Sequence, residues 1–129
     1  MKRATAAILL IAILMTGCGI STRLPDDPVV FEQNVNQEEG YAYLSADDKI
    51  YVPYCPFKRR YIGDCIGYYD YPGDEYTEGG RFYIYEFRGY SSDEWIVDYD
   101  VRINEGMVMR ELNSTNIPEG LRSEYDWNN

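Results

Sequence analysis

The chemistry open to this chain is limited by the amino acids that it lacks. Its 129 residues contain no histidine. This absence removes the usual general base for serine and cysteine nucleophiles, and also the imidazole ligands of zinc. Carboxylate, tyrosine and thiol groups remain, supplied by 22 Asp and Glu, 14 Tyr and 3 Cys residues. The chain is therefore limited to carboxylate, tyrosine or thiol chemistry, or to no chemistry at all.

The densest group of such side chains is an acidic, tyrosine-rich stretch between Tyr68 and Gly80. Aromatic rings stack on sugar faces, carboxylates accept hydrogen bonds from hydroxyl groups, and tyrosine is a frequent anchor in protein interfaces. We therefore expect a binding surface for a glycan or a protein, formed by Tyr69, Tyr71, Asp74 and Tyr76. The competing interpretation is that tyrosines simply pair across strands, which suits Tyr83, Tyr85 and Tyr99 best.

Paired carboxylates could also hydrolyse a glycosidic bond, if two of them faced each other across a cleft and one had a raised pKa. No pair stands out among so many acids, so we assign no catalytic residue and expect a protein that is not an enzyme. Asp98 and Asp100 lie on one face of a predicted strand, which we interpret as a solvated outer face. The loop after Asp70 lacks the ligand spacing of an EF-hand, so we expect no metal and no cofactor.

Cys55 and Cys65 form an even pair in a chain that carries export signals, described below. Such pairs commonly form disulfides outside the cytoplasm, and this one would close a short loop worth about 3 kcal/mol of stability. We therefore predict a Cys55–Cys65 disulfide. The alternative is two separate buried thiols, whereas a redox catalyst would need the closer Cys-x-x-Cys spacing.

The net charge of −10 argues against a nucleic-acid partner, because phosphate binding requires clustered Lys and Arg. Lys58, Arg59 and Arg60 form one short basic run. They are expected to pair with neighbouring acids or to contact anionic lipid.

The N-terminus has the pattern of an export signal. Lys2 and Arg3 precede a ten-residue apolar run, too short for a transmembrane helix, which ends in Met15-Thr16-Gly17-Cys18. This ending resembles the lipobox of bacterial lipoproteins, although Met15 replaces the usual leucine. The resemblance implies that residues 1–17 are removed and that Cys18 receives a diacylglyceryl group, which palmitate would label. We therefore expect a lipid anchor on the extracytoplasmic face of the cell membrane, or in the outer membrane of a Gram-negative cell.

The remaining chain divides into a tether and a domain. Residues 18–39 are polar and lack periodicity, so we predict a flexible tether in which Val29-Val30-Phe31 could dock as an edge strand. Residues 40–129 are predicted to form one small domain outside the membrane. Removal of Lys2 and Arg3 leaves 10 Lys and Arg against 22 Asp and Glu, a side-chain charge of −12.

The domain is predicted to be mainly β, a small antiparallel barrel or sandwich. Aromatic and β-branched residues predict strands over 41–44, 49–52, 61–69, 81–87, 95–102 and 107–111. Turn residues separate the first two strands at 45–48, and Gly63-Asp64 predicts a bulge in the third. The predicted strand over 81–87, the Arg88-Gly89-Tyr90 loop and the following Trp95-Ile96-Val97 together resemble the later strands of bacterial SH3-like barrels.

Three short stretches are similar to small, uncharacterised lipoproteins of Gram-positive gut bacteria: Ile66–Asp70, Gly89–Ile96 and Ile117–Leu121. That resemblance implies no activity. Together these observations predict a lipid-anchored cell-envelope protein with a binding or structural role, exercised through an acidic, tyrosine-rich surface. The alternatives are a small carboxylate-dependent envelope hydrolase, or an inhibitor or immunity lipoprotein that caps a basic partner.

Overall fold

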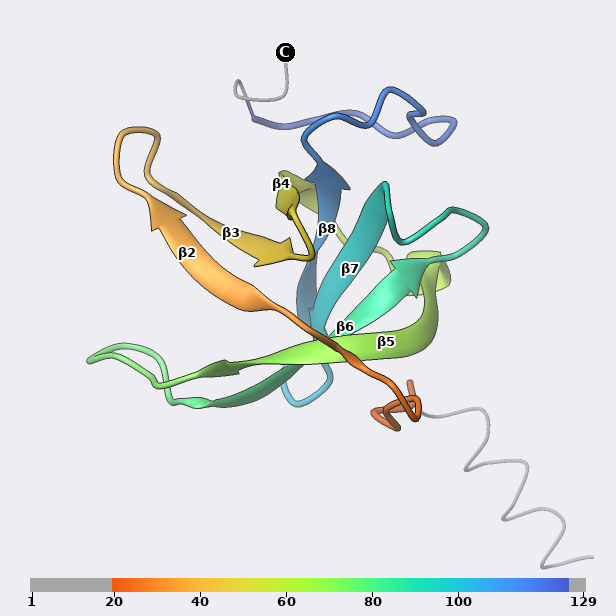
Figure 1. Ribbon diagram of the computed structural model, residues 1–129. Coiled ribbons are helices and arrows are strands. Elements are labelled where there is room, and N and C mark those ends of the chain that lie inside the picture. The colour runs from red at the N-terminus through yellow and green to blue at the C-terminus, as the bar shows by residue number, and fades with distance from the viewer. Residues whose placement is uncertain (1–19, 126–129) are drawn as a thin grey trace, which may run out of the picture.

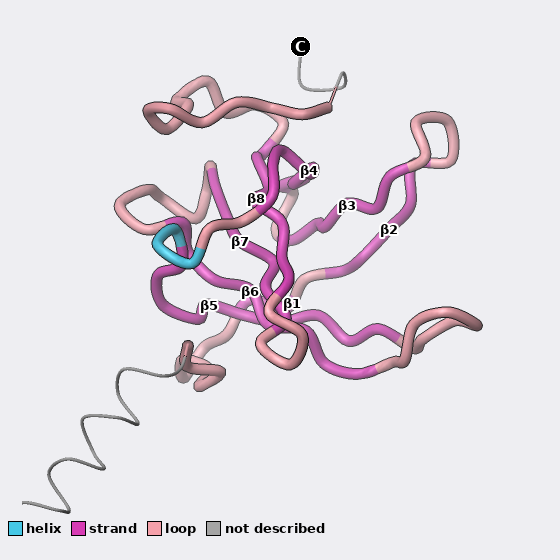
Figure 2. The backbone as a smooth tube through the Cα atoms, turned by 180° about the vertical axis from the view of Figure 1, so that it is seen from behind, coloured by secondary structure: helices cyan, strands magenta, loops and turns pink. Residues whose placement is uncertain are grey.

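The computed structural model describes residues 20–125. This part of the chain forms eight strands and one turn of 3-10 helix (Figure 1, Figure 2). The elements are β1 (Val29–Val30), β2 (Glu32–Asn36), β3 (Tyr41–Ala46), β4 (Lys49–Pro56), η1 (Arg59–Tyr61), β5 (Ile62–Tyr71), β6 (Gly80–Phe87), β7 (Trp95–Asp100) and β8 (Glu105–Glu111). The predicted mainly β fold is confirmed. The predicted signal peptide and Cys18 lie outside the described residues.

The strands form one sheet that nearly closes into a barrel. Its order is β1-β5-β6-β7-β8-β4-β3-β2, with β1 and β5 parallel and every other neighbouring pair antiparallel. The two end strands, β1 and β2, are consecutive along the chain and separated only by Phe31. One continuous segment therefore joins both ends of the sheet. No helix in the described part of the chain is long and apolar enough to cross a membrane.

The joining segment lies within the range predicted to be a tether. Val29 pairs with Gly67, and the backbone N–H of Phe31 donates to the carbonyl of Tyr68 at 2.8 Å. The backbones approach so closely that a Cβ at position 67 would lie 2.1 Å from the carbonyl oxygen of Val29, so only glycine fits. Residues 29–36 thus belong to the sheet, and the docking expected for Val29–Phe31 extends through β2.

The local turns largely follow the sequence. Asp47 and Asp48 connect β3 to β4 with φ values of 49° and 65°, which matches a two-residue hairpin turn that asparagine and aspartate tolerate. The register of β5 against β6 shifts on both sides of Cys65, beside the bulge predicted at Gly63-Asp64. The strand predicted over 95–102 ends earlier, at Asp100, because Asp100 already pairs with Glu105 across a turn.

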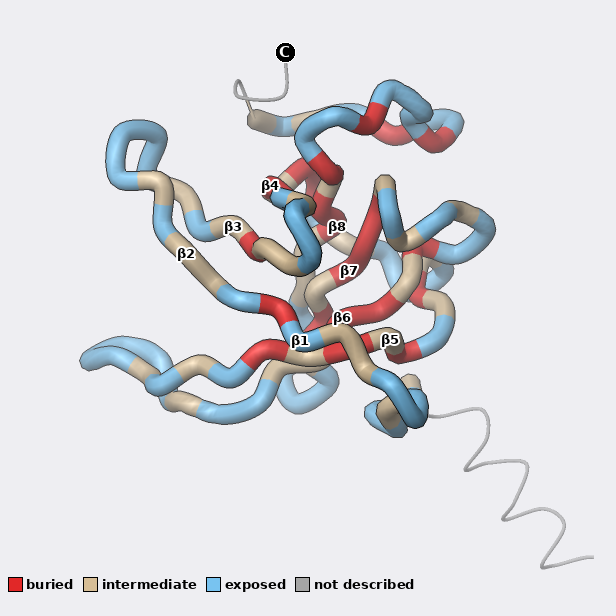
Figure 3. The backbone as a smooth tube through the Cα atoms, viewed as in Figure 1, coloured by how far each residue is buried: buried red, intermediate tan, exposed pale blue. Residues whose placement is uncertain are grey.

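Both faces of the central strands are buried (Figure 3). One face forms the large core: Tyr54, Cys55, Ile62, Cys65, Tyr85, Phe87, Trp95, Val97, Tyr99, Val108 and Leu121. The other face forms the small core: Phe31, Leu44, Tyr51, Tyr69, Ile84, Ile96 and Met109. Ile20 and Leu24, which precede β1, pack against the large core. Polar side chains on the central strands therefore lie close to one core or the other.

Candidate functional site

The predicted tyrosine-rich surface is only partly a surface. Tyr69 is 5% exposed, belongs to the small core and stacks on Phe82 with ring centroids 5.2 Å apart. This differs from the expected surface role, because β5 turns the side chain of Tyr69 inward. Tyr71 is half-buried and meets Phe82 edge to face at 6.2 Å. Tyr76 is 88% exposed at the tip of the β5–β6 hairpin.

Asp74 organises this hairpin loop. Its carboxylate accepts the hydroxyl of Tyr71 and the backbone N–H groups of Tyr76 and Thr77, the last two at 2.8 and 2.6 Å. These hydrogen bonds hold the pKa of Asp74 below its usual value, the Tyr71 hydroxyl having the largest effect. The carboxylate of Asp74 is thus used within the loop and shapes it, whereas the exposed ring of Tyr76 remains available to a ligand.

Asp98 lies in the opposite environment from the one that its sequence pattern suggested. Alternation along β7 places it on the same face as Ile96, toward the small core rather than on a solvated outer face. The side chain is half-buried, and Tyr69 donates its hydroxyl to Oδ2 at 2.8 Å. No described cation forms an ion pair with Asp98.

The pKa of Asp98 is raised to about 7. Burial is the main cause; the hydrogen bond from Tyr69 acts in the other direction, and the nearby charge of Asp100 adds a smaller increase. Asp98 therefore changes charge near neutral pH. The two acids expected to be equivalent on one strand face have different environments, because Arg102 holds both carboxylate oxygens of Asp100 at 3.0 Å and lowers its pKa.

Asp98 lines two cavities. One, of about 290 Å³, is also lined by Tyr69, Phe82, Asp100, Ile103 and Glu105. The other, of about 180 Å³, is lined by residues of the β2–β3 hairpin, β4 and β8: Gln33, Ala42, Tyr43, Leu44, Pro53 and Met109. Met107 lines both cavities together with Asp98. A ligand that filled either cavity would meet this carboxyl group.

A third cavity, of about 430 Å³, continues from the first toward the tip of the β5–β6 hairpin. It shares Phe82, Asp100 and Ile103 with the first cavity and adds Tyr76 and Arg102. We call the three cavities together the hairpin cleft. Figure 1 shows the β2–β3 and β5–β6 hairpins projecting to the same side of the molecule. The 180 Å³ cavity is lined by the β2–β3 hairpin, and the 430 Å³ cavity is lined by the β5–β6 hairpin with Tyr76. The 290 Å³ cavity, which Asp98 lines, shares residues with both.

The two remaining cysteines are free thiols, so the predicted disulfide is absent from the structure. Cys65, Tyr85, Val97, Val108 and Cys55 are successive partners across five strands. The cysteines therefore lie on β5 and β4, with three strands between them in the sheet, and not on neighbouring strands. Burial raises the pKa of Cys55 to about 11, which keeps this thiol unreactive.

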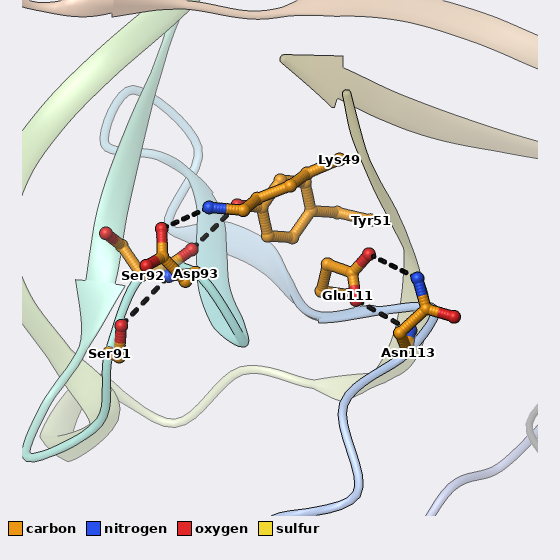
Figure 4. A network of polar contacts seen from close by, with 7 residues as sticks. All are labelled: Lys49, Tyr51, Ser91, Ser92, Asp93, Glu111 and Asn113. Carbon is orange, nitrogen blue, oxygen red and sulfur yellow. Dashed lines mark hydrogen bonds and ion pairs between the residues drawn. The ribbon is translucent and has the colours of Figure 1, made fainter. Parts of the chain in front are cut away.

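A second polar cluster lies where β4 meets the turn before β7 (Figure 4). Lys49 pairs with Asp93, the hydroxyl of Tyr51 donates to the carbonyl of Ser92 at 2.7 Å, and Glu111 accepts the backbone N–H of Asn113 at 2.6 Å. These groups bind one another and tie the turn to the sheet. The cluster is therefore structural.

Nothing in the described part of the chain groups three or more acids or cysteines as a metal site would. The sequence did not single out Asp98, because the alternation of apolar and charged residues along β7 is typical of a strand with one solvent-exposed face. Ile96 was the available signal, since an apolar residue on the acidic face of β7 indicates that this face is also buried. The chain matches no protein-family model, no curated protein and no solved structure.

Proposed function

We propose that this chain is a lipid-anchored binding protein of the cell envelope that holds a cationic group of its partner in the hairpin cleft. The observation that carries the proposal is Asp98, an ionisable group with no described cation partner at the junction of two cavities. A buried carboxylate is costly unless a cation or further hydrogen bonds compensate it. A ligand cation would supply that compensation.

The lining of the cleft suits a lysine or arginine side chain. Asp98 and Glu105 provide negative charge in the first cavity, and the ring of Tyr69 provides a surface for an alkyl stem. Arg102 already holds Asp100 and lies 5.0 Å from the Phe82 ring. The mature side-chain charge of −12 would also steer a basic partner toward the domain. An inhibitor or immunity lipoprotein that caps a basic segment of another protein is one form of this function.

The binding site is tested by NMR titration with a matched pair of probes, N-acetyl-lysinamide and the uncharged N-acetyl-norleucinamide. The lysine probe should shift resonances of Asp98, Ile103 and Met107 at pH 8, and the norleucine probe should not. Asp98→Asn should abolish the shifts, whereas Asp93→Asn, on the structural cluster around Lys49, should leave them intact. Equal shifts by both probes would contradict recognition of a cation.

The lipid anchor is supported by the charged start, the short apolar run and the lipobox-like ending at Cys18. Wild-type cells grown with radioactive palmitate should label the chain and remove its first 17 residues. Cys18→Ser should abolish both, while Cys55→Ser should change neither. An unlabelled wild-type chain would contradict the anchor and leave the cleft proposal standing.

One observation favours a second function, a carboxylate hydrolase. Asp98, protonated in part near neutral pH, and the ionised Asp100 line the same 290 Å³ cavity, as an acid and a carboxylate do in glycoside hydrolysis. Both oxygens of Asp100, however, are engaged by Arg102. Release of reducing ends from a bacterial cell-wall glycan, lost in both Asp98→Asn and Asp100→Asn, would select this function over binding.

A further inference from the structure

The N-terminal segment of the described chain is docked on the domain. Ile20 and Leu24 pack against the large core. Together with Ser21, Arg23 and Pro25 they line a cavity of about 440 Å³ beside the start of β5. Cys18 precedes Ile20 by only two residues, which span at most about 7 Å. A lipid on Cys18 would therefore hold this side of the barrel close to the bilayer, instead of suspending the domain on a long tether.

The same side gathers half of the cations that remain after signal-peptide removal. We call this group the basic face: Arg23, Lys58, Arg59, Arg60 and Arg88. All five are exposed. Arg59 and Arg60 begin η1, and Lys58 precedes it. Arg88 is joined to this turn by two hydrogen bonds: its backbone N–H donates to the carbonyl of Tyr61 at 2.7 Å, and its guanidinium donates to the carbonyl of Ile62 at 2.9 Å.

Arg23 and Arg88 line the same 440 Å³ cavity, which connects the turn to the N-terminal segment. Asp64 also lines it, and Asp26 and Asp27 follow closely along the chain. Away from this face, by contrast, Lys49, Arg81 and Arg102 are each paired with an acid. No described acid forms an ion pair with Lys58, Arg60 or Arg88.

Aromatic rings reinforce this face. Tyr61 stacks on Phe87 with ring centroids 4.7 Å apart, the guanidinium of Arg60 lies 5.5 Å from the Tyr61 ring, and Tyr90 meets Phe87 edge to face. Tyrosine beside arginine and lysine is common where proteins meet the headgroup region of a bilayer. Figure 2 shows η1 on the same side of the molecule as the start of the described chain, opposite the tips of the two hairpins.

We propose that the basic face docks on the anionic phospholipid surface to which the chain is anchored, so that the hairpin cleft points away from the membrane. The proposal rests on the lipid anchor proposed above. Cations that lie within a Debye length of an anionic bilayer are attracted to it. The anchor brings the face to the surface, and these charges would then fix its orientation.

The test uses the lipidated protein purified from membranes and reconstituted in vesicles of phosphatidylcholine, with or without phosphatidylglycerol. Amine acetylation, followed by mass spectrometry, reports the exposure of Lys58. Thr77→Lys supplies a matched reporter at the tip of the opposite hairpin. Phosphatidylglycerol should slow acetylation of Lys58 by about fivefold or more and leave the reporter unchanged. Arg59→Glu with Arg60→Glu should restore the rate at Lys58.

Each other outcome overturns the docking. The protein could float with the phosphatidylglycerol vesicles and still show equal acetylation rates at Lys58 and at the reporter. That result would contradict the docking and leave the anchor standing. Equal protection of Lys58 in phosphatidylcholine alone would show that anionic lipid is not the partner. A chain that floats with neither vesicle would overturn the anchor and the docking together.

Discussion

At the scale of single residues, the carboxyl groups of Asp74, Asp98 and Asp100 have pKa values shifted in opposite directions by their surroundings. Asp74 and Asp100 are held in their ionised form by hydrogen-bond donors, which lower the pKa of each. Asp98 has one hydrogen bond and no described cation, and burial raises its pKa to about 7. One carboxyl group in the cleft is therefore kept ready to change charge near neutral pH.

This difference predicts an unusual dependence of stability on pH. Because the pKa of Asp98 is higher in the folded chain than in the unfolded one, the folded state binds more protons between about pH 4 and pH 7. Stability should therefore fall as pH rises through this window, by up to about 4 kcal/mol. Urea unfolding at pH 5 and pH 8 should show a smaller fall in Asp98→Asn than in wild type. Parallel changes in the two proteins would contradict the burial of Asp98.

At the scale of elements, local signals predicted much of the fold. The β3–β4 turn at Asp47 and Asp48 and the bulge at Gly63-Asp64 could be predicted because the residues that set them are adjacent in the chain. The parallel pairing of β1 with β5 could not, since it joins Val29 to Gly67 across a long stretch of sequence. Alternation also predicted two faces for β7 without revealing that both are buried.

The pairing of β1 with β5 can be tested by substitution at Gly67. A methyl group at position 67 would collide with the backbone of Val29, so Gly67→Ala should lower the free energy of unfolding by about 2 kcal/mol or more. Gly63→Ala is a matched control in the same strand, because its nearest contact is a Glu86 side-chain atom at 3.2 Å. The control should cost less than about 1 kcal/mol. Similar losses in the two variants would argue against the β1–β5 contact.

In the candidate site, too, features set by adjacent residues could be predicted from the sequence, whereas features set by long-range pairing could not. Tyr76 could be placed from sequence because a glycine-rich, polar loop between two strands is exposed in most arrangements. Tyr69 and Asp98 could not, because their meeting depends on the register of β5, β6 and β7 together. Long-range register, rather than residue type, decides that Asp98 is half-buried beside Tyr69.

At the scale of the whole molecule, charge and shape are divided between two ends. The basic face and the docked N-terminal segment lie on one side, and the tips of the β2–β3 and β5–β6 hairpins lie on the other (Figure 2). Tyr76 is at one of these tips and lines the 430 Å³ cavity of the hairpin cleft. A lipid on Cys18 would connect the first end to the membrane and present the second to the space outside it. The two proposals thus describe one arrangement, with attachment at the base and recognition at the far side.

The central claim is that Asp98 in its charged form recognises a cation in the hairpin cleft, and the affinity of N-acetyl-lysinamide at two pH values tests it most directly. With a pKa of about 7, Asp98 is mostly protonated at pH 6 and mostly ionised at pH 8. We expect roughly tenfold tighter binding at pH 8 than at pH 6, and we expect this difference to disappear in Asp98→Asn. Affinity that is equal at the two pH values, or unchanged in that variant, would contradict it.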